Sequence, residues 1–296
     1  MSYQLTFERA ETFIYNNARL LDRRRFEFLF KKGDKHGVIA ALRAYQNDDG
    51  GFGNALEPDI RCPQSQPVST EMALMIMDEL GYFDPDTLDG IIRYLRRVTL
   101  TGGGVPTSFL SGREYPHAQW WFTGADTRPS INPTGRIVGL LYKQQVRDDF
   151  YDEPWFVNTV DYLWESFANT KPQGYHDGIQ WIAFLQNTPH KNRASAIFSK
   201  IESWMKTERP IETDPDADGY VQKVLDWAPA SSSYARRFVS QSDIKTHFNA
   251  LLKDQQEDGG WPITWIPISP GVELEWRGSI TVDRLKTIAS YSALAT

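Results

Sequence analysis

Glu57, Asp59 and Arg61 stand at alternate positions just before an apolar helical stretch that begins near Pro67. Charged side chains that approach a buried helix need a partner or water, because burying an unpaired charge is costly. One arrangement is an ion pair at the rim of the fold, and the other places the carboxyl groups in a cavity. In an apolar cavity the pKa of a carboxyl group rises, and the group can then act as a general acid. We therefore take Glu57 and Asp59 as the candidate catalytic residues.

Aromatic side chains in two unusually long connections are candidates for substrate binding. Tryptophan faces attract cations and also stack on sugar rings, so such residues suit the wall of a cavity. Packing within the connection itself is the alternative for each of them. The connections are 100–131 and 256–278, and the side chains are His117, Trp120, Trp121 and Trp276.

Asn132 and Arg136 stand at the start of a predicted helix over 133–143. An arginine at this place can bind an anion such as a diphosphate. A structural ion pair is the alternative, and both residues are kept as candidates for substrate binding. His176 and Asp177 open another predicted helix, where capping by Asp177 is favoured because adjacent residues on a helix do not face each other.

No metal site is predicted. Asp148, Asp149 and Asp152 match the Asp-Asp-x-x-Asp pattern that ligates magnesium diphosphate, but they fall in a connection between two helical segments. The acids of 214–218 resemble half of a calcium loop, yet Leu225 occupies the position where a bidentate glutamate is needed. We predict no cofactor, and magnesium only if the substrate is a diphosphate.

Two kinds of helical pattern alternate along the chain and would position these residues. In one kind, apolar residues form a stripe, which indicates a helix with one buried side. In the other kind the segment is apolar nearly all round, as at 72–77, which indicates a helix buried on every side. The striped segments are 36–46, 84–99, 153–168, 192–207 and 241–256, and the others are 67–80, 133–143 and 175–186. Residues 5–30 are also helical with a break near Asn16 and Asn17, 220–238 is ambiguous, and 279–294 form the last helix.

The pattern Gln-x-x-Asp-Gly-Gly-aromatic occurs twice, at 46–52 and at 255–261. Glycines of this kind end a helix, and the aspartate can bond the amides of the turn. A structural device repeats, whereas a catalytic one usually does not, so we expect both copies to be structural. The glutamines should bond backbone groups at helix ends, and the aromatic side chains should pack between helices. The residues concerned are Gln46, Asp49 and Phe52 in the first copy and Gln255, Asp258 and Trp261 in the second.

These two motifs resemble the Gln-Trp repeats of the terpenoid cyclase and protein prenyltransferase superfamily, which includes squalene cyclase-like repeats. The stretch Gly-Gly-Phe-Gly at 50–53 also resembles the repeat of prenyltransferase β-subunits. The resemblance implies an α/α toroid and an apolar or isoprenoid substrate. The chain lacks the Asp-x-Asp-Asp proton donor of class II cyclases, and Cys62 lies outside the zinc pattern of the prenyltransferases.

The expected fold is all-α. The alternation of helices predicts an α/α toroid of about six helical hairpins in two concentric layers, formed as one domain over 1–296. The net charge of −6 argues against nucleic acid as a partner. With one cysteine, no apolar signal core and no long apolar stretch, the default expectation is a cytoplasmic protein without a transmembrane segment.

Three function hypotheses remain open from the sequence. The first is an enzyme related to terpenoid cyclases or prenyltransferases, with a small apolar substrate in a tryptophan-lined central cavity. The second is a carbohydrate-active α/α toroid, either a hydrolase or a lyase. The third is a non-catalytic protein of the same fold that binds a small molecule. The sequence carries no signal for the oligomeric state.

Overall fold

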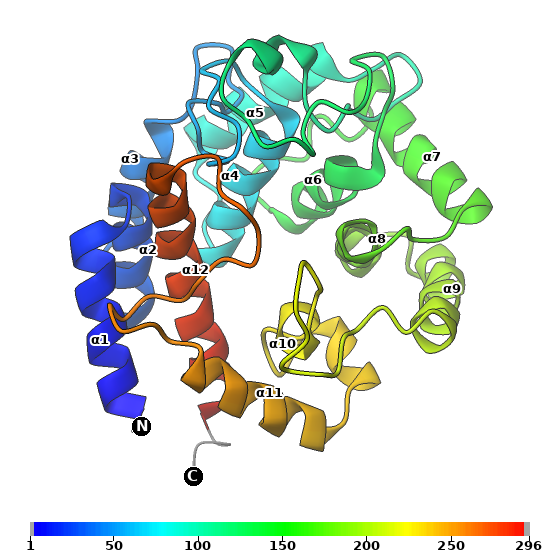
Figure 1. The fold of residues 1–296 in the computed structure, drawn as a ribbon. Coiled ribbons are helices and arrows are strands. Elements are labelled where there is room, and N and C mark those ends of the chain that lie inside the picture. Colours follow the sequence, from blue (N-terminus) through cyan, green and yellow to red (C-terminus); the bar gives the residue numbers. More distant parts are fainter. Residues whose placement is uncertain (1–2, 293–296) are drawn as a thin grey trace. The chain divides into compact units, whose positions relative to one another are not determined.

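The computed structural model of the chain describes residues 3–292, and these are all-helical, as the sequence predicts (Figure 1). Three isolated β-bridges occur within this range, and no strand of a sheet. None of the helices described is long and apolar enough to cross a membrane. The α-helices are α1 (Tyr3–Asn17), α2 (Leu20–Phe30), α3 (Lys35–Arg43), α4 (Pro67–Glu79), α5 (Pro85–Val98), α6 (Ile131–Lys143), α7 (Pro154–Asn169), α8 (Tyr175–Asn187), α9 (Lys191–Thr207), α10 (Val224–Trp227), α11 (Gln241–Lys253) and α12 (Pro270–Ser290).

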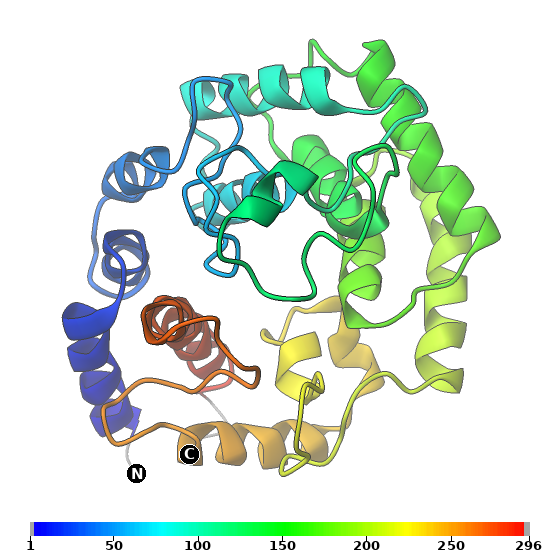
Figure 2. The ribbon, with the colours of Figure 1, turned by 45° about the horizontal axis from the view of Figure 1, so that its top comes forward.

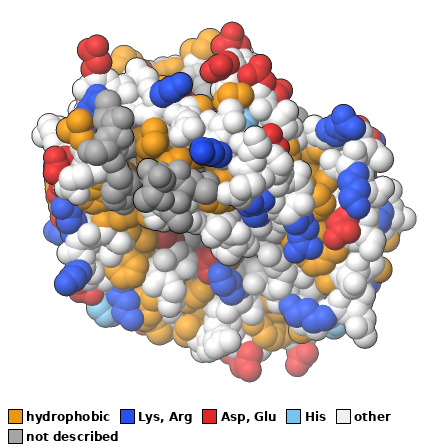
Figure 3. Space-filling view, turned by 90° about the horizontal axis from the view of Figure 1, so that it is seen from below, with side chains coloured by type: hydrophobic (Ala, Val, Ile, Leu, Met, Phe, Trp, Pro, Cys, Tyr) orange, Lys and Arg blue, Asp and Glu red, His pale blue; other side chains and the backbone are white. Residues whose placement is uncertain are grey.

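The chain divides into two compact units. Unit 1 combines Met1–Val38 with Met205–Thr296, and unit 2 is Ile39–Trp204. The expectation of a single domain stays a prediction. On the face shown in Figure 3, lysine and arginine side chains are interspersed with acidic and hydrophobic ones rather than gathered into one basic patch.

Unit 2 is built around α4, α6 and α8, which lie side by side, with α5 and α7 in a second layer (Figures 1 and 2). Two glycines on one face of α6 allow the closest of these approaches. A Cβ atom on Gly135 would lie 2.8 Å from the carbonyl oxygen of Gln180, and one on Gly139 would lie 2.5 Å from that of Ala183. Larger residues would push α8 away, so these glycines fix the spacing of the two helices.

Unit 1 has its core on α12, which packs against α1 and α2. Arg25 of α2 lies in this contact and bonds Asp22 of its own helix, together with Ser279 and Asp283 of α12. Helix α11 contributes apolar side chains to the same core. The largest buried residues there are Phe26, Phe248 and Trp261.

The two glycine motifs form the same set of hydrogen bonds, one in each unit. In unit 2, Gln46 donates from Nε2 to the carbonyls of Gly50 (3.0 Å) and Thr87 (3.2 Å). In unit 1, Gln255 donates in the same way to Gly259 (2.9 Å) and Thr6 (2.9 Å). The expected role of the glutamines at helix ends is therefore confirmed.

The remaining contacts of the motifs also correspond. Asp49 and Asp258 each accept a hydrogen bond from the amide two residues later, at 2.9 and 3.0 Å. The amides of Phe52 and Trp261 each donate to a threonine hydroxyl, on α4 and α12 respectively. Both aromatic side chains are buried. The two motifs are thus a structural device, as predicted, that ties a helix end to two further helices.

Two sequence-based expectations about helices need correction. Helix α4 is not buried on every side, because Met75 is 40% exposed and Met72 is half-buried. Helix α12 begins at Pro270 rather than at 279, with Ser269 as its N-cap. The apolar pattern near Pro270 is interrupted by glycines and charges, which hid the proline and serine start signals. The ambiguous stretch 220–238 contains only the short α10 and one 3-10 turn.

Candidate functional site

A cluster of polar side chains lies on the N-terminal halves of α4, α6 and α8 in unit 2. It contains Glu71, Asn132, Arg136 and Gln180, and we call it the Glu71 cluster. Asn132 has non-helical backbone angles, so the regular part of α6 begins after it, as the Asn-Pro signal predicts. Each residue is therefore placed close to the start of one of three helices that pack together.

Gln180 is the centre of the cluster and is buried. Its Nε2 donates to Oε1 of Glu71 (2.6 Å) and to Oδ1 of Asn132 (3.1 Å). Its Oε1 accepts a hydrogen bond from the backbone amide of Arg136 (2.6 Å). One glutamine thus fixes the other three residues, and the close α6–α8 packing at Gly135 brings it within reach.

Glu71 is only 3% exposed and pairs with Arg136, whose Nη1 lies 3.0 Å from Oε1. Burial raises the pKa of Glu71, and Arg136 and Gln180 oppose this shift. Since the raised pKa favours the protonated form in the folded chain, any stability that Glu71 contributes is present at acid pH. That contribution is lost as the pH rises from the ordinary carboxyl pKa through the raised one.

Several polar atoms of the cluster make no hydrogen bond within the described residues. Both hydrogen bonds of Glu71 use Oε1, and its Oε2 makes none within the described chain. Arg136 bonds through its backbone amide and Nη1, which leaves Nε and Nη2 without a hydrogen bond in residues 3–292. One oxygen of Glu71 and one edge of the Arg136 guanidinium thus lie outside the hydrogen bonds of the cluster.

Both apolar and polar side chains surround the Glu71 cluster. Nη1 of Arg136 also contacts the sulfur of the exposed Met75 at 3.1 Å. His176, at the start of α8, lies at the surface, yet the protein around its ring lowers its pKa and the Arg136 cation lowers it further. Asp177 accepts a hydrogen bond from the amide of Gln173, consistent with a role at the start of α8.

The predicted acids Glu57 and Asp59 are buried in the turn before α4. Oε1 of Glu57 accepts a hydrogen bond from the amide of Asp59 at 3.2 Å. The backbone of this turn pairs with the first long connection, because Ala118 donates to the carbonyl of Asp59 at 3.0 Å and Ile60 bridges His117. The structure thus places the backbone at 59–60 beside the backbone at 117–118, while the catalytic role of Asp59 and the binding role of His117 stay predictions.

The predicted tryptophans occupy different settings. Trp120 is 48% exposed, whereas Trp121 packs against a small core with Phe122 and Ile60. Trp276 lies in unit 1 and contacts Trp265. The structure therefore places Asn132 and Arg136 in the Glu71 cluster, and places the other candidates outside its hydrogen bonds.

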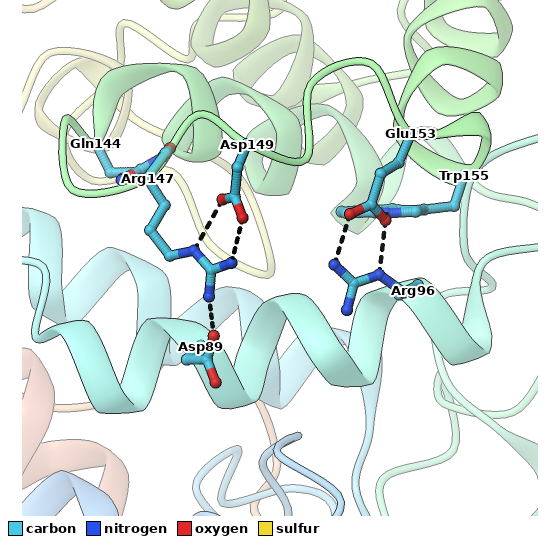
Figure 4. A network of polar contacts seen from close by, with 7 residues as sticks. All are labelled: Asp89, Arg96, Gln144, Arg147, Asp149, Glu153 and Trp155. Atoms are coloured by element: carbon cyan, nitrogen blue, oxygen red, sulfur yellow. Dashed lines mark hydrogen bonds and ion pairs between the residues drawn. The ribbon is translucent and has the colours of Figure 1, made fainter.

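Of the three acids in the Asp-Asp-x-x-Asp match, Asp149 forms an ion pair within unit 2, and Glu153, which follows the match, forms another (Figure 4). Arg147 bonds both carboxylate oxygens of Asp149, at 2.9 and 2.6 Å, and also pairs with Asp89 of α5. Arg96 of α5 likewise bonds both oxygens of Glu153 at 2.6 Å. These contacts tie the connection between α6 and α7 to α5, as expected for a loop.

We expect no stoichiometric zinc in the purified protein. No group of three or more metal-ligating side chains occurs among the residues that the structure describes, and the thiol of Cys62 is buried with a raised pKa. A high thiol pKa disfavours the thiolate that binds metals. Elemental analysis after dialysis checks this, and one zinc per chain would contradict it.

Comparisons with known proteins give one informative likeness. No family model matches the chain, and no curated protein matches it. A crystal structure of a protein from Actinoplanes is similar, with a TM-score of 0.56 and 14% sequence identity over 97% of this chain and 100% of that chain. At this identity the likeness concerns the fold alone.

Proposed function

We propose that this chain is an α/α toroid of the terpenoid cyclase and prenyltransferase kind, and an enzyme that acts on a small apolar substrate. The second glycine motif supports the closed arrangement. The first motif follows α3 and bonds α4 and α5, whereas the second follows α11 and bonds α12 and α1. In a closed ring the last helix is followed by the first. Within unit 1, α1 is bonded by the second motif as α5 is bonded by the first.

The free carboxyl oxygen of Glu71 is the observation that carries the catalytic proposal. A carboxyl group with a raised pKa keeps its proton at a higher pH than usual, which suits a general acid. Its Oε1 is held by Gln180 and Arg136, so Oε2 is the atom that can exchange a proton with a substrate. Glu71 therefore joins Glu57 and Asp59 as a proton-donor candidate and is the one we favour.

The substrate side of the proposal uses the neighbours of Glu71. Met72 and Met75 give α4 an apolar strip beside the cluster, and methionine adapts to irregular apolar ligands. The free edge of Arg136 would bind an anionic or polar end of the same molecule. The Glu71 cluster contains one carboxyl group in the described structure, whereas glycoside hydrolysis usually requires two, which is why the apolar substrate is preferred.

Ligand identity can be tested first. Mass spectrometry of small molecules released from the purified protein should find an apolar compound. Farnesol and farnesyl diphosphate should raise the melting temperature, while maltotriose should not. Arg136→Met should weaken the diphosphate more than the alcohol. Stabilisation by maltotriose alone would overturn the proposal in favour of a carbohydrate-active protein.

Catalysis is tested by three matched carboxamide variants. We expect Glu71→Gln to lower conversion of the identified ligand about a hundredfold, since proton transfer typically contributes at least this much. The variant should keep its fold, because the carboxamide can still accept the hydrogen bonds of Oε1, with a stability change of about 1 kcal/mol. Product analysis by gas chromatography checks the rate. Full activity of Glu71→Gln with a loss in Glu57→Gln or Asp59→Asn would move the proton donor to the turn before α4.

A further inference from the structure

Three aromatic rings of unit 1 form a cluster apart from the Glu71 cluster. Trp265 contacts Trp276 with ring centroids 5.3 Å apart and an angle of 87° between the rings. It contacts Tyr220 at 6.1 Å and 85°. Two further rings thus stand nearly perpendicular to one indole. We call these residues the aromatic cluster.

The aromatic cluster lies at the surface rather than in the core. Tyr220 is 55% exposed, and Ile266, next to Trp265, is 87% exposed. Trp265 and Trp276 are half-buried, and neither belongs to the buried core of unit 1. The indole N–H of Trp265 is shielded from solvent and has no hydrogen-bond partner in the described chain. Exposed apolar side chains that form a contiguous patch mark binding sites in many proteins.

The two loops that carry the rings are held firmly in place. The loop of Tyr220 is fixed by His247, whose Nε2 lies 3.0 Å from the carbonyl oxygen of Thr213, and by Lys223, which bonds the carbonyl of Pro215. The loop of Trp265 ends at Ser269, which caps α12, and it contains two prolines. Fixed loops lower the entropic cost of binding a small ligand.

The two segments that carry the rings contain acidic residues and no basic ones. Residues 211–222 and 262–276 contain no lysine or arginine, and their acids are Glu212, Asp214, Asp216, Asp218, Glu273 and Glu275. The bases that follow each segment are engaged elsewhere. Lys223 bonds a backbone carbonyl, and Arg277 pairs with Asp258 at 2.7 Å and bonds the carbonyl of Trp261. The segments that carry the rings therefore have a net negative charge.

We propose that the aromatic cluster binds a small organic cation of the quaternary ammonium type. The faces of tryptophan and tyrosine rings are electron-rich, and perpendicular rings present several faces to one compact cation. The acidic loops raise the local concentration of cations. A neutral apolar ligand would contact the same rings, but the acidic residues would not increase its affinity. This inference is independent of the proposed function, because it uses other residues in the other unit.

The test is calorimetric titration with choline, compared with its neutral carbon isostere, in which a tert-butyl group replaces the trimethylammonium group. We expect choline to bind saturably and the isostere to bind about tenfold more weakly. Tyr220→Leu and Trp276→Leu should each weaken choline binding about fivefold or more, because leucine keeps apolar bulk without a ring face. Raising the salt concentration should weaken choline binding but not that of the isostere.

Control variants separate this site from general apolar binding. Ile266→Ser removes an exposed apolar side chain from the same loop, so choline affinity should stay within about twofold. Tyr220 lies on an exposed loop, so its variant should fold even if Trp276→Leu does not, and circular dichroism verifies this. The proposal is overturned if choline shows no saturable binding, if the isostere binds equally well, or if Tyr220→Leu has no effect. Tighter binding of glucose than of choline would also overturn it.

Discussion

Replacing Trp261 with alanine is expected to lower the free energy of unfolding by roughly 3–5 kcal/mol. The indole is 1% exposed and lies in the core of unit 1 with side chains of α11 and α12. Its Nε1 donates to the carbonyl oxygen of Leu251 at 2.8 Å. Removing the ring leaves a large cavity and a buried carbonyl without its partner, and both effects destabilise the folded chain.

Two control variants divide this effect into its parts. Trp261→Phe matches the aromatic residue of the first motif, Phe52, and should cost less, because most of the ring volume remains while the hydrogen bond is lost. Trp120→Ala removes a tryptophan that is 48% exposed and should cost about 1 kcal/mol or less. Urea titrations followed by circular dichroism and by fluorescence provide the values, and coincident transitions justify a single free energy. A loss below about 1 kcal/mol for Trp261→Ala would contradict a structural role.

The second large effect is expected from alanine at the glycines of the two motifs. Gly50 and Gly259 have φ angles of +92° and +95°, in the region that side chains disfavour. A Cβ atom at these positions would lie 2.0 Å from the carbonyl oxygen of Gly90 and 2.2 Å from that of Arg9. The strained backbone costs of order 1–3 kcal/mol, and forcing the helices apart adds roughly 1–3 kcal/mol.

Gly219 provides the matched control for this prediction. Its φ angle is +87°, but a Cβ atom there would meet no atom within 4 Å. Gly219→Ala therefore measures the backbone cost alone, and its difference from Gly259→Ala measures the contact with α1. Thermal unfolding of the three alanine variants should rank Gly219→Ala as the mildest. Equal losses in all three would mean that the close approach of the helices does not matter.

The positions of the helices were largely predictable because their start signals are local. Asp84 caps α5 with Pro85 at its first position. Helix α4 likewise has a proline, Pro67, at its first position, although the side chain of Gln66 before it makes no capping bond. The exposed side of α4 was not predictable from hydrophobicity alone. Whether Met75 faces solvent depends on how far the neighbouring helices reach over it, which no local pattern encodes.

Only some residues of the Glu71 cluster could be predicted from the sequence. Arg136 is conspicuous in the sequence because it is a cation at a helix start, whereas Glu71 adjoins the apolar run 72–77 and belongs to no motif. A carboxyl group beside an otherwise apolar helix is itself a signal, since it must find a partner. Gln180 gave no such signal, because a glutamine in a helix is ordinary until the structure shows three partners around it.

Unit 1 combines two segments that are far apart in the sequence, and this affects how it folds during synthesis on the ribosome. Thr6 is bonded by Gln255, which follows it by 249 residues, and Arg9 bonds the carbonyl oxygen of Gln256 at 2.7 Å. At ordinary translation rates α1 emerges roughly 10–50 s before the segment that covers it. In the later part of that interval unit 2 is already complete, whereas Phe13 and Ile14 still lack the segment that buries them. Nascent chains stalled before Gln255 should therefore bind holdase chaperones through α1, and release should follow the emergence of Trp261 from the ribosome.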